Sequence, residues 1–275
     1  MELEGKTALI PGASRPVGRA IAKCFARQGA HLFLPVFDWP ESVTELREEF
    51  TENRFSFELV QTDLRKTSEV KKLVQTVAAR SGKLHYLINN IERGGMPIVH
   101  GGYDLAHNRD QWDLEFATSL KAKWLLFHHC LDLMQKCHGC SVVNISSVAG
   151  VTGRSGPGAL LFNDGYSAAN RAISSLTETW ARETAPLVRV NELCLGLIRG
   201  RHGEGTRGWS LLSDDDKKEL TGQILLARTG RPEEVADAVY FLAVRASYLT
   251  GAVIRMDGGF SLGATRVPPM PDGVL

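Results

Sequence analysis

Apolar positions along the chain follow two alternating patterns. Short runs rich in Val, Ile, Leu and Phe are followed by longer stretches in which apolar residues recur every three or four positions. The first pattern is typical of strands buried on both faces, and the second of helices with one buried face. The runs predict strands at 7–10, 31–36, 56–60, 85–89, 141–145, 188–193 and 252–256, and the stretches predict helices at 17–28, 42–50, 67–80, 111–136, 166–184 and 233–244.

The order of these elements indicates the fold class. Strands that alternate with helices pair in parallel through right-handed crossovers, with helices on both faces of the sheet. We therefore predict a Rossmann-type α/β fold, with a doubly wound, parallel, seven-stranded sheet in a three-layer α/β/α arrangement. No repeat or change of composition divides residues 1–275, so a single domain is expected.

Composition and charge narrow the range of partners. The chain has 32 basic and 31 acidic residues, a formal net charge of +1, so nothing indicates attraction to nucleic acid or to a membrane. We therefore expect a small-molecule substrate. The first residues lack the apolar core of a signal peptide, and no run of about 18 apolar residues follows, so a cytoplasmic location is predicted.

The number and spacing of the cysteines predict that they are reduced thiols. Five cysteines are spread over the chain, an odd number that is not typical of a secreted disulfide framework. Cys137 and Cys140 have the spacing of metal ligands, but no second pair of this kind accompanies them. A structural zinc site usually takes four ligands, so no metal is expected.

A glycine-containing turn joins the first predicted strand to the first predicted helix. It runs Pro11-Gly12-Ala13-Ser14-Arg15-Pro16-Val17-Gly18. Backbone N–H groups at the start of such a helix can face a pyrophosphate, with glycine wherever a Cβ would clash. By itself this pattern fits an ordinary tight turn equally well.

Several motifs together resemble those of the short-chain dehydrogenase/reductase family. The turn is similar to the family's T-G-x-x-x-G-x-G fingerprint, with Pro11 in place of the threonine and Pro16 in place of the middle glycine. Tyr166-Ser167-Ala168-Ala169-Asn170 is similar to the family's Y-x-x-x-K motif, and residues 228–236 and 250–260 agree with its C-terminal part. The resemblance covers nearly the whole chain. It implies an NAD(P)-dependent oxidoreductase that forms a homodimer or homotetramer.

The resemblance also implies a dinucleotide site at the carboxyl ends of the strands. Pro16 removes one backbone donor, but proline is tolerated in a first helical turn, so we expect NAD or NADP still to bind. The residues at matching positions are Gly12, Ser14, Arg15, Val17, Gly18, Asp38, Asp63, Leu64, Asn90, Tyr166, Asn170 and Ile198.

The choice between NAD and NADP stays open. Asp38 could accept a hydrogen bond from a ribose 2′-hydroxyl, which favours NAD, but it lies two positions beyond the family's usual acidic site, where Val36 stands. A solvated turn carboxylate is an equally good interpretation of Asp38. Arg15 stands where NADP-dependent relatives often carry a basic residue.

The resemblance assigns four catalytic positions, two of them substituted. Ser147 and Tyr166 match the family's serine and tyrosine, whereas Asn170 replaces its lysine and Ser119 its asparagine. Residues four apart lie on one helix face, so a lysine at 170 would act on the ionisation of the phenol. Without it, a tyrosine with an ordinary pKa of about 10 stays protonated near neutral pH and suits reduction better than oxidation.

Three further segments could contribute to the site. Residues 153–164 look like an insertion, for which a variable surface loop is favoured over a roof on the substrate pocket formed by residues 159–162. Lys123, one helical turn beyond Ser119, could replace the missing ammonium, but a solvated lysine is the expected alternative. Residues 199–226 are expected to cover the substrate.

Three functions follow from these features. The leading hypothesis is reduction of a carbonyl of a small apolar substrate, with Tyr166 as proton donor and Ser147 polarising the oxygen. The substitutions also suggest an enzyme of this fold without hydride transfer, such as a lyase, a dehydratase or a dehalogenase-like enzyme. Halohydrin dehalogenases resemble the chain only in part, because they carry arginine where Asn170 stands. The third hypothesis is a non-catalytic nucleotide-binding protein.

Overall fold

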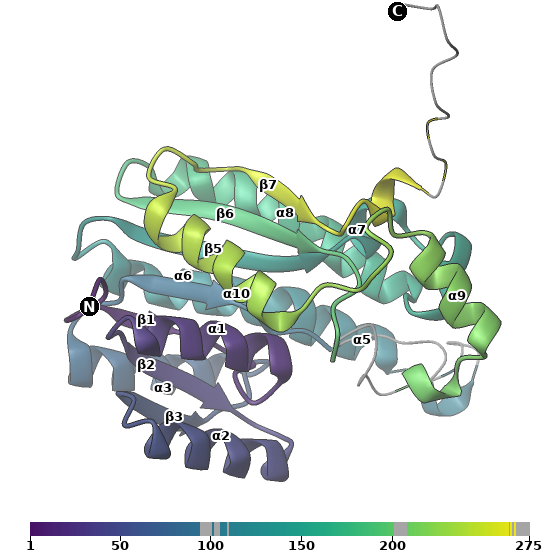
Figure 1. The fold of residues 1–275 in the computed structure, drawn as a ribbon. Coiled ribbons are helices and arrows are strands. Elements are labelled where there is room, and N and C mark those ends of the chain that lie inside the picture. The colour runs from purple at the N-terminus through teal and green to yellow at the C-terminus, as the bar shows by residue number, and fades with distance from the viewer. Residues whose placement is uncertain are drawn as a thin grey trace, which may run out of the picture.

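A seven-stranded parallel sheet forms the centre of the molecule (Figure 1). The computed structural model describes residues 1–93, 101, 105–108, 110–200, 208–263, 265 and 267. The strand order is β3-β2-β1-β4-β5-β6-β7, which confirms the predicted doubly wound sheet in a single domain. The strands are β1 (Thr7–Leu9), β2 (His31–Val36), β3 (Phe57–Gln61), β4 (Tyr86–Asn89), β5 (Cys140–Ser147), β6 (Val188–Leu195) and β7 (Val253–Met256).

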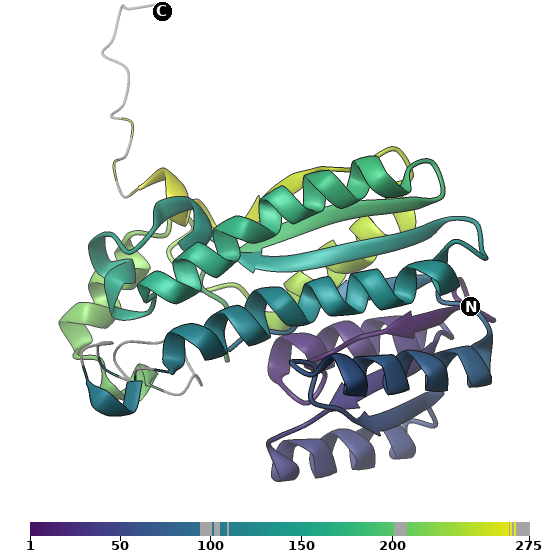
Figure 2. The ribbon, with the colours of Figure 1, turned by 180° about the vertical axis from the view of Figure 1, so that it is seen from behind.

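Helices cover both faces of the sheet, as the views from front and back show (Figures 1 and 2). Successive strand residues point to opposite faces, so Ala8 and Ile10 belong to one apolar core and Leu9 to the other. On the first face lie α1 (Pro16–Arg27), α2 (Pro40–Glu52) and α10 (Pro232–Tyr240), and on the second α3 (Thr67–Ser81), α6 (Ala122–Met134) and α8 (Asp164–Thr184). The predicted three-layer arrangement is confirmed.

Shorter elements gather where β5 and β6 end. The predicted helix 111–136 consists of α5 (Gln111–Glu115), the π-helical turn η2 (Phe116–Lys121) and α6. The 3-10 helices η1, η4 and η6 span Ala106–Asn108, Trp209–Leu211 and Phe260–Leu262. At the opposite end of the sheet, the π-helical turn η5 (Phe241–Arg245) extends α10 and accepts hydrogen bonds from Arg189 near the start of β6. The sequence pattern did not predict α7 (Ala149–Thr152) or the 3-10 helix η3 (Gly156–Leu160).

A third apolar cluster lies at this end of the sheet, and it corrects the interpretation of residues 153–164. Leu161 and Phe162 are each 1% exposed, so this part is not a surface loop. Both pack with Tyr166 in a cluster that also holds Ile224 and Phe260. The run following η3 is buried because it meets the residues after β7 and α9 (Asp214–Gly222).

The structure also corrects the expectation that Lys123 is solvated. Its side chain is 1% exposed, and its ammonium donates to the backbone carbonyl of Ile145 at 2.7 Å. Lys123 lies on the buried face of α6, where Phe127 and Cys130 continue the helical spacing. The stem therefore packs under β5 rather than extending into water.

One pair of cysteines departs from the predicted reduced state. Cys137 and Cys140 form a disulfide, whereas Cys24, Cys130 and Cys194 are free. The turn between α6 and β5 brings the two Cα atoms to 6.5 Å, which is within reach of a disulfide. In the described part of the chain, no helix is long and apolar enough to cross a bilayer.

Candidate active site

The glycine turn after β1 has backbone geometry that only glycine fits. Gly12 has a φ of 73°, and a Cβ there would lie 2.7 Å from the backbone oxygen of Asn90. A Cβ on Gly18 would lie 2.2 Å from the backbone oxygen of Gly12. Pro16 is the first residue of α1, where its missing N–H costs no helical hydrogen bond. The turn therefore retains a cradle suited to a phosphate at the start of a helix.

Asn90 connects this turn to the end of β4. Its side-chain nitrogen donates to the carbonyl of Pro11 at 3.4 Å, and the residue is 8% exposed. Its side-chain oxygen is buried and accepts no hydrogen bond from the residues that the structure describes. A buried acceptor without a donor is costly, so a ligand hydroxyl or amide fits this place.

The far end of the same strand edge carries the residues expected at the adenosine. The guanidinium of Arg65 donates to both oxygens of Asp63 at 2.8 and 2.9 Å, and this contact lowers the pKa of that carboxyl. Arg15 lies 4.5 Å from the ring centre of Trp39 in a cation–π contact. Asp38 is exposed.

Tyr166 lies in the first turn of α8 and is fully buried. The side chain of Asn163 caps the helix by accepting from the backbone N–H of Tyr166 at 2.7 Å. The Phe162 ring stacks on the phenol ring with centres 6.0 Å apart. The phenol donates to the carboxylate of Glu92 at 2.9 Å. Cap, ring and carboxylate together hold the tyrosine in one orientation.

Asn170 lies one turn after Tyr166 on α8, and Ser147 lies at the end of β5. Asn170 is 1% exposed and donates to the backbone carbonyl of Tyr166 at 3.0 Å, while its side-chain oxygen accepts from no described residue. Ser147 ends β5 and accepts from the backbone N–H of Ala149 at 3.2 Å. A Cβ on Gly150 would lie 2.7 Å from the backbone nitrogen of Arg171, so α7 packs closely against α8. This contact brings the Ser147 end of β5 to α8.

Ser119 lies in the π-helical turn η2 and belongs to a polar cluster. It accepts from the backbone N–H of Arg93 at 3.0 Å and donates to the carboxyl group of Glu115 at 3.4 Å. Glu115 is fully buried, and this burial, together with the charge of Glu92, raises its pKa to about 8. The hydrogen bonds of Ser119 are thus made with Arg93 and Glu115. The π-helical turn that carries Ser119 is a kind of element that often occurs at functional sites.

Sequence reasoning did not identify Glu92 and Glu115. Two signals were available: Glu92 is a charged residue just after a buried strand, at the edge where parallel sheets bind ligands. Glu115 lies four residues before Ser119, so both side chains lie on one helix face. Neither signal shows that Glu92 contacts Tyr166 or that the charge of Glu92 acts on Glu115.

The raised pKa of Glu115 predicts an unusual pH dependence of stability. Between its ordinary pKa of 4.5 and about 8, Glu115 is protonated in the folded protein and ionised in the unfolded chain. The folded state then binds more protons, so the free energy of unfolding falls as pH rises, by at most about 1.4 kcal/mol per pH unit. Glu115→Gln should remove this part of the slope.

Urea unfolding of wild type and Glu115→Gln between pH 5 and about 8 measures the pH slope of the free energy of unfolding in each protein. Other titrating groups, such as His85, contribute equally to both slopes and cancel when the two are compared. Equal pH slopes in the two proteins would show that Glu115 is not held protonated.

The remaining predicted cofactor residues lie along the same edge. Ile198 is 2% exposed and forms an isolated parallel bridge with Gly230, which fixes the backbone that follows β6. Ser14 and Val17 are part of the glycine turn, and Leu64 follows β3. Of the predicted covering segment 199–226, residues 201–207 lie outside the described part of the chain, while Leu212 and Ile224 pack in the Tyr166 cluster.

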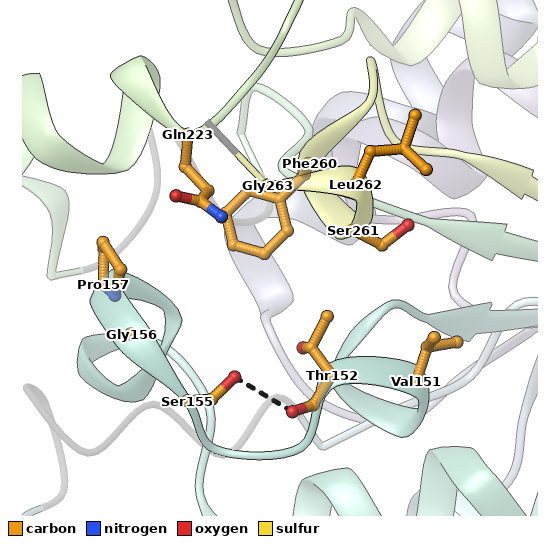
Figure 3. Close-up of a pocket in the computed structure, with 10 residues that line it drawn as sticks. All are labelled: Val151, Thr152, Ser155, Gly156, Pro157, Gln223, Phe260, Ser261, Leu262 and Gly263. Atoms are coloured by element: carbon orange, nitrogen blue, oxygen red, sulfur yellow. Dashed lines mark hydrogen bonds between the residues drawn. The ribbon is translucent and has the colours of Figure 1, made fainter. Parts of the chain in front are cut away.

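A cavity of about 410 Å³ adjoins the Tyr166 cluster (Figure 3). Gln223 and Phe260 lie across it from Thr152 and Ser155, and the Phe260 ring belongs to both the cavity wall and the cluster. No side chain in the lining carries a charge. The lining residues are Val151, Thr152, Ser155, Gly156, Pro157, Gln223, Phe260, Ser261, Leu262 and Gly263.

Within the described residues, no group of three or more His, Cys, Asp or Glu side chains is placed to hold a metal ion. The polar side chains of the candidate site carry phenol, hydroxyl, amide and carboxyl groups.

Comparison with known proteins identifies the family. A family model described as enoyl-(acyl carrier protein) reductase matches residues 12–261. A 3-oxoacyl-(acyl-carrier-protein) reductase FabG from Thermotoga maritima is 30% identical over 94% of this chain and 99% of its own length. A 7alpha-hydroxysteroid dehydrogenase from Clostridium sardiniense is 28% identical over 96% of each chain.

Solved structures agree with the fold. A short-chain dehydrogenase/reductase from Serratia marcescens superimposes with a TM-score of 0.80 at 23% identity, over 95% of this chain and 100% of that one. At this identity the likeness establishes the fold alone. The family model and the Thermotoga relative also establish the family, because each matches nearly the whole chain. The chain therefore belongs to the short-chain dehydrogenase/reductase family of NAD(P)-dependent oxidoreductases.

Proposed function

We propose that the protein reduces a carbonyl group of a small, largely apolar substrate with NAD(P)H. Tyr166 donates a proton to the carbonyl oxygen, and the hydroxyl of Ser147 polarises the same oxygen. Asn170 occupies the position of the family's lysine and Ser119 that of its asparagine, so no ammonium is supplied from position 170. A protonated phenol suits reduction, because alcohol oxidation needs a base.

The observation that carries this proposal is the short segment linking the glycine turn to the tyrosine. Asn90 touches Gly12, and two residues later Glu92 accepts the hydrogen bond of Tyr166. A dinucleotide in the glycine cradle would thus extend towards the phenol along the ends of β1 and β4. When bound, NAD(P)H supplies the hydride that reduces the carbonyl carbon.

Two buried acceptors support the fit of such a cofactor. The side-chain oxygens of Asn90 and Asn170 are both buried and accept from no described residue. Hydroxyl groups of a ribose offer the donors that these oxygens need. Asn170 would then position the nicotinamide ribose without changing the charge beside Tyr166.

The surroundings of Tyr166 favour an uncharged, partly apolar substrate. The cluster around the phenol includes Phe162, Leu212 and Phe260, and the adjoining cavity is lined by uncharged residues. An ionic substrate group buried there would meet no counter-charge in the lining. The relatives named above are a 3-oxoacyl-(acyl-carrier-protein) reductase and a 7alpha-hydroxysteroid dehydrogenase, so an acyl and a steroid substrate are the classes to test first.

The proposal is tested with purified protein, NADH or NADPH, and a panel of a 3-oxoacyl thioester, an oxosteroid and an aryl ketone. We expect cofactor fluorescence to be quenched on binding and at least one carbonyl to be reduced. Cofactor binding without reduction of any panel member would favour a non-catalytic nucleotide-binding protein. Absence of cofactor binding would favour an enzyme without hydride transfer.

We further propose that NADPH is preferred over NADH. The guanidinium of Arg15 is held at the start of α1 by the Trp39 ring, where it can meet a 2′-phosphate. Val36 fills the end of β2, and Asp38 is exposed beyond it. Arg15→Ala should weaken NADPH binding about tenfold, a loss of about 1.4 kcal/mol, and leave NADH binding almost unchanged.

Fluorescence titration of wild type and Arg15→Ala with NADPH and with NADH measures the affinity of each protein for each cofactor. Arg27→Ala, in the last turn of α1, is a matched control that removes the same charge away from the turn. An equal loss for NADH and NADPH would contradict the assignment of Arg15 to the 2′-phosphate.

We also propose a homodimer or homotetramer in the cytoplasm. Large apolar side chains are exposed on α6 at Trp124 and near β7 at Phe241, Tyr248 and Leu262. Exposed apolar side chains of this size often belong to subunit contacts. Light scattering during size-exclusion chromatography determines the assembly.

A further inference from the structure

A carboxyl group of this chain touches the proposed proton donor. Tyr166 Oη donates to Glu92 Oε2 at 2.9 Å. The tyrosine is fully buried and held by its helix cap, whereas Glu92 is only half-buried and follows β4 by three residues. The phenol oxygen is therefore linked to a titratable group that has access to water.

The carboxyl group of Glu115 interacts electrostatically with that of Glu92. The charge of Glu92 helps to raise the pKa of Glu115, and the cation of Arg93 opposes this effect. Ser119 connects the segment that carries Glu92 to Glu115, because it accepts a hydrogen bond from the backbone N–H of Arg93 and donates one to the carboxyl group of Glu115. Among the residues that the structure describes, the charged and titratable groups facing Glu92 include Tyr166 from α8, Glu115 from α5 and the neighbouring Arg93. Two carboxyl groups placed in this way do not readily ionise together.

We propose that Glu92 is the proton-relay partner of Tyr166 and returns a proton to the phenol oxygen during carbonyl reduction. This inference rests on the proposed function. It gives Glu92 a task that the side chain of Asn170 cannot perform, because an amide does not titrate in this pH range. Glu92 acts through Tyr166 and does not itself contact the substrate.

The proposed step balances in protons and electrons. Bound NAD(P)H would supply a hydride to the carbonyl carbon. As the carbonyl π electrons move to the oxygen, Tyr166 gives its proton to that oxygen. The O–H bond of protonated Glu92 then breaks, and its proton passes to the phenolate. The carboxylate that remains is reprotonated from water. The substrate is reduced by two electrons and the nicotinamide is oxidised by two.

The protonation state of Glu92 determines where the phenol proton points. Ionised Glu92 accepts the Tyr166 hydrogen bond and competes with the substrate oxygen for that proton. Protonated Glu92 can donate to the phenol oxygen, which leaves the phenol proton directed at the substrate. The rate of reduction is therefore expected to fall as pH rises through the titration of Glu92.

Glu92→Gln tests the relay through kinetics. The amide keeps the size of the side chain but cannot release a proton, so kcat for reduction should fall about 10- to 100-fold, with KM for the cofactor unchanged. The decline of kcat with rising pH that is assigned to Glu92 should disappear in this variant. Glu92→Asp should retain part of the rate and the decline, whereas Glu45→Gln, which removes an exposed carboxylate on α2, should behave as wild type.

A second readout does not depend on turnover. The ultraviolet difference spectrum between wild type and Tyr166→Phe reports the ionisation of Tyr166 as pH is raised. Because the negative charge of Glu92 disfavours a phenolate, Tyr166 should ionise at lower pH in the Glu92→Gln background. Unchanged ionisation of Tyr166 in that background, or a wild-type kcat with a wild-type pH profile, would overturn the relay. If the wild type reduces no carbonyl, the proposed function fails, and the ionisation of Tyr166 still decides whether Glu92 acts on it.

Discussion

Replacing Tyr166 with phenylalanine is expected to lower kcat for carbonyl reduction by about 10²- to 10⁴-fold, the contribution typical of a positioned general acid. The phenol is the proposed proton donor, and it is held in place because its ring is stacked on Phe162 and its backbone is capped by Asn163. Phenylalanine keeps the ring and loses only the hydroxyl. The measurement is NADPH oxidation at saturating carbonyl substrate.

Cofactor binding separates a catalytic effect from a structural one in this variant. Tyr166 also stands at a position expected to contact the cofactor, but it lies outside the glycine cradle expected to hold the pyrophosphate, so the affinity for NADPH in Tyr166→Phe should fall far less than kcat. A variant that reduces substrate at the wild-type rate would remove Tyr166 from the mechanism. A variant that loses cofactor binding as well would assign the tyrosine a structural role.

Gly18→Ala should abolish or strongly weaken dinucleotide binding. The new Cβ would lie 2.2 Å from the backbone oxygen of Gly12 and 2.7 Å from the side-chain nitrogen of Asn90, so the turn must move. Overpacking of this kind typically costs about 1–3 kcal/mol, and a displaced turn loses the N–H groups that face the phosphates. We expect Kd for NADPH to rise at least about tenfold.

Gly222→Ala provides the matched control for that change. Gly222 ends α9, and no described atom lies within 4 Å of the position of its Cβ. Stability and cofactor affinity should therefore be close to wild type. Thermal unfolding measures the stability of Gly18→Ala and Gly222→Ala, and fluorescence titration measures their affinity for NADPH. Equal cofactor affinity in the two variants would contradict the close packing assigned to the glycine turn.

Much of the fold follows from local patterns. Burial on both faces makes the central strands nearly continuous apolar runs. The partly exposed edge strands β3 and β7 are also rich in Val, Ile, Leu and Phe, so all seven strands could be placed within a few residues. The helix bounds were less well predicted where the helix type changes, as at the π-helical turn η2. The buried position of Lys123 had a signal, since it shares helical spacing with Phe127 and Cys130, but a lysine is usually expected to reach water.

The candidate site was predicted only in part, because its chemistry depends on contacts between distant segments. Gly12, Gly18 and Tyr166 belong to motifs that sequence comparison detects. The bond from Tyr166 to Glu92 spans 74 residues and depends on how the ends of β4 and α8 meet. The burial of Phe162 likewise depends on residues that follow β7. No local pattern contains this information.

The most direct test of carbonyl reduction is transfer of deuterium from NADPH that carries deuterium at both C4 positions. The substrate is any member of the carbonyl panel that is reduced, and mass spectrometry locates the label in the alcohol. We expect one deuterium on the carbinol carbon of each product molecule. An alcohol without this label, or no alcohol from any panel member although NADPH binds, would contradict hydride transfer by this protein.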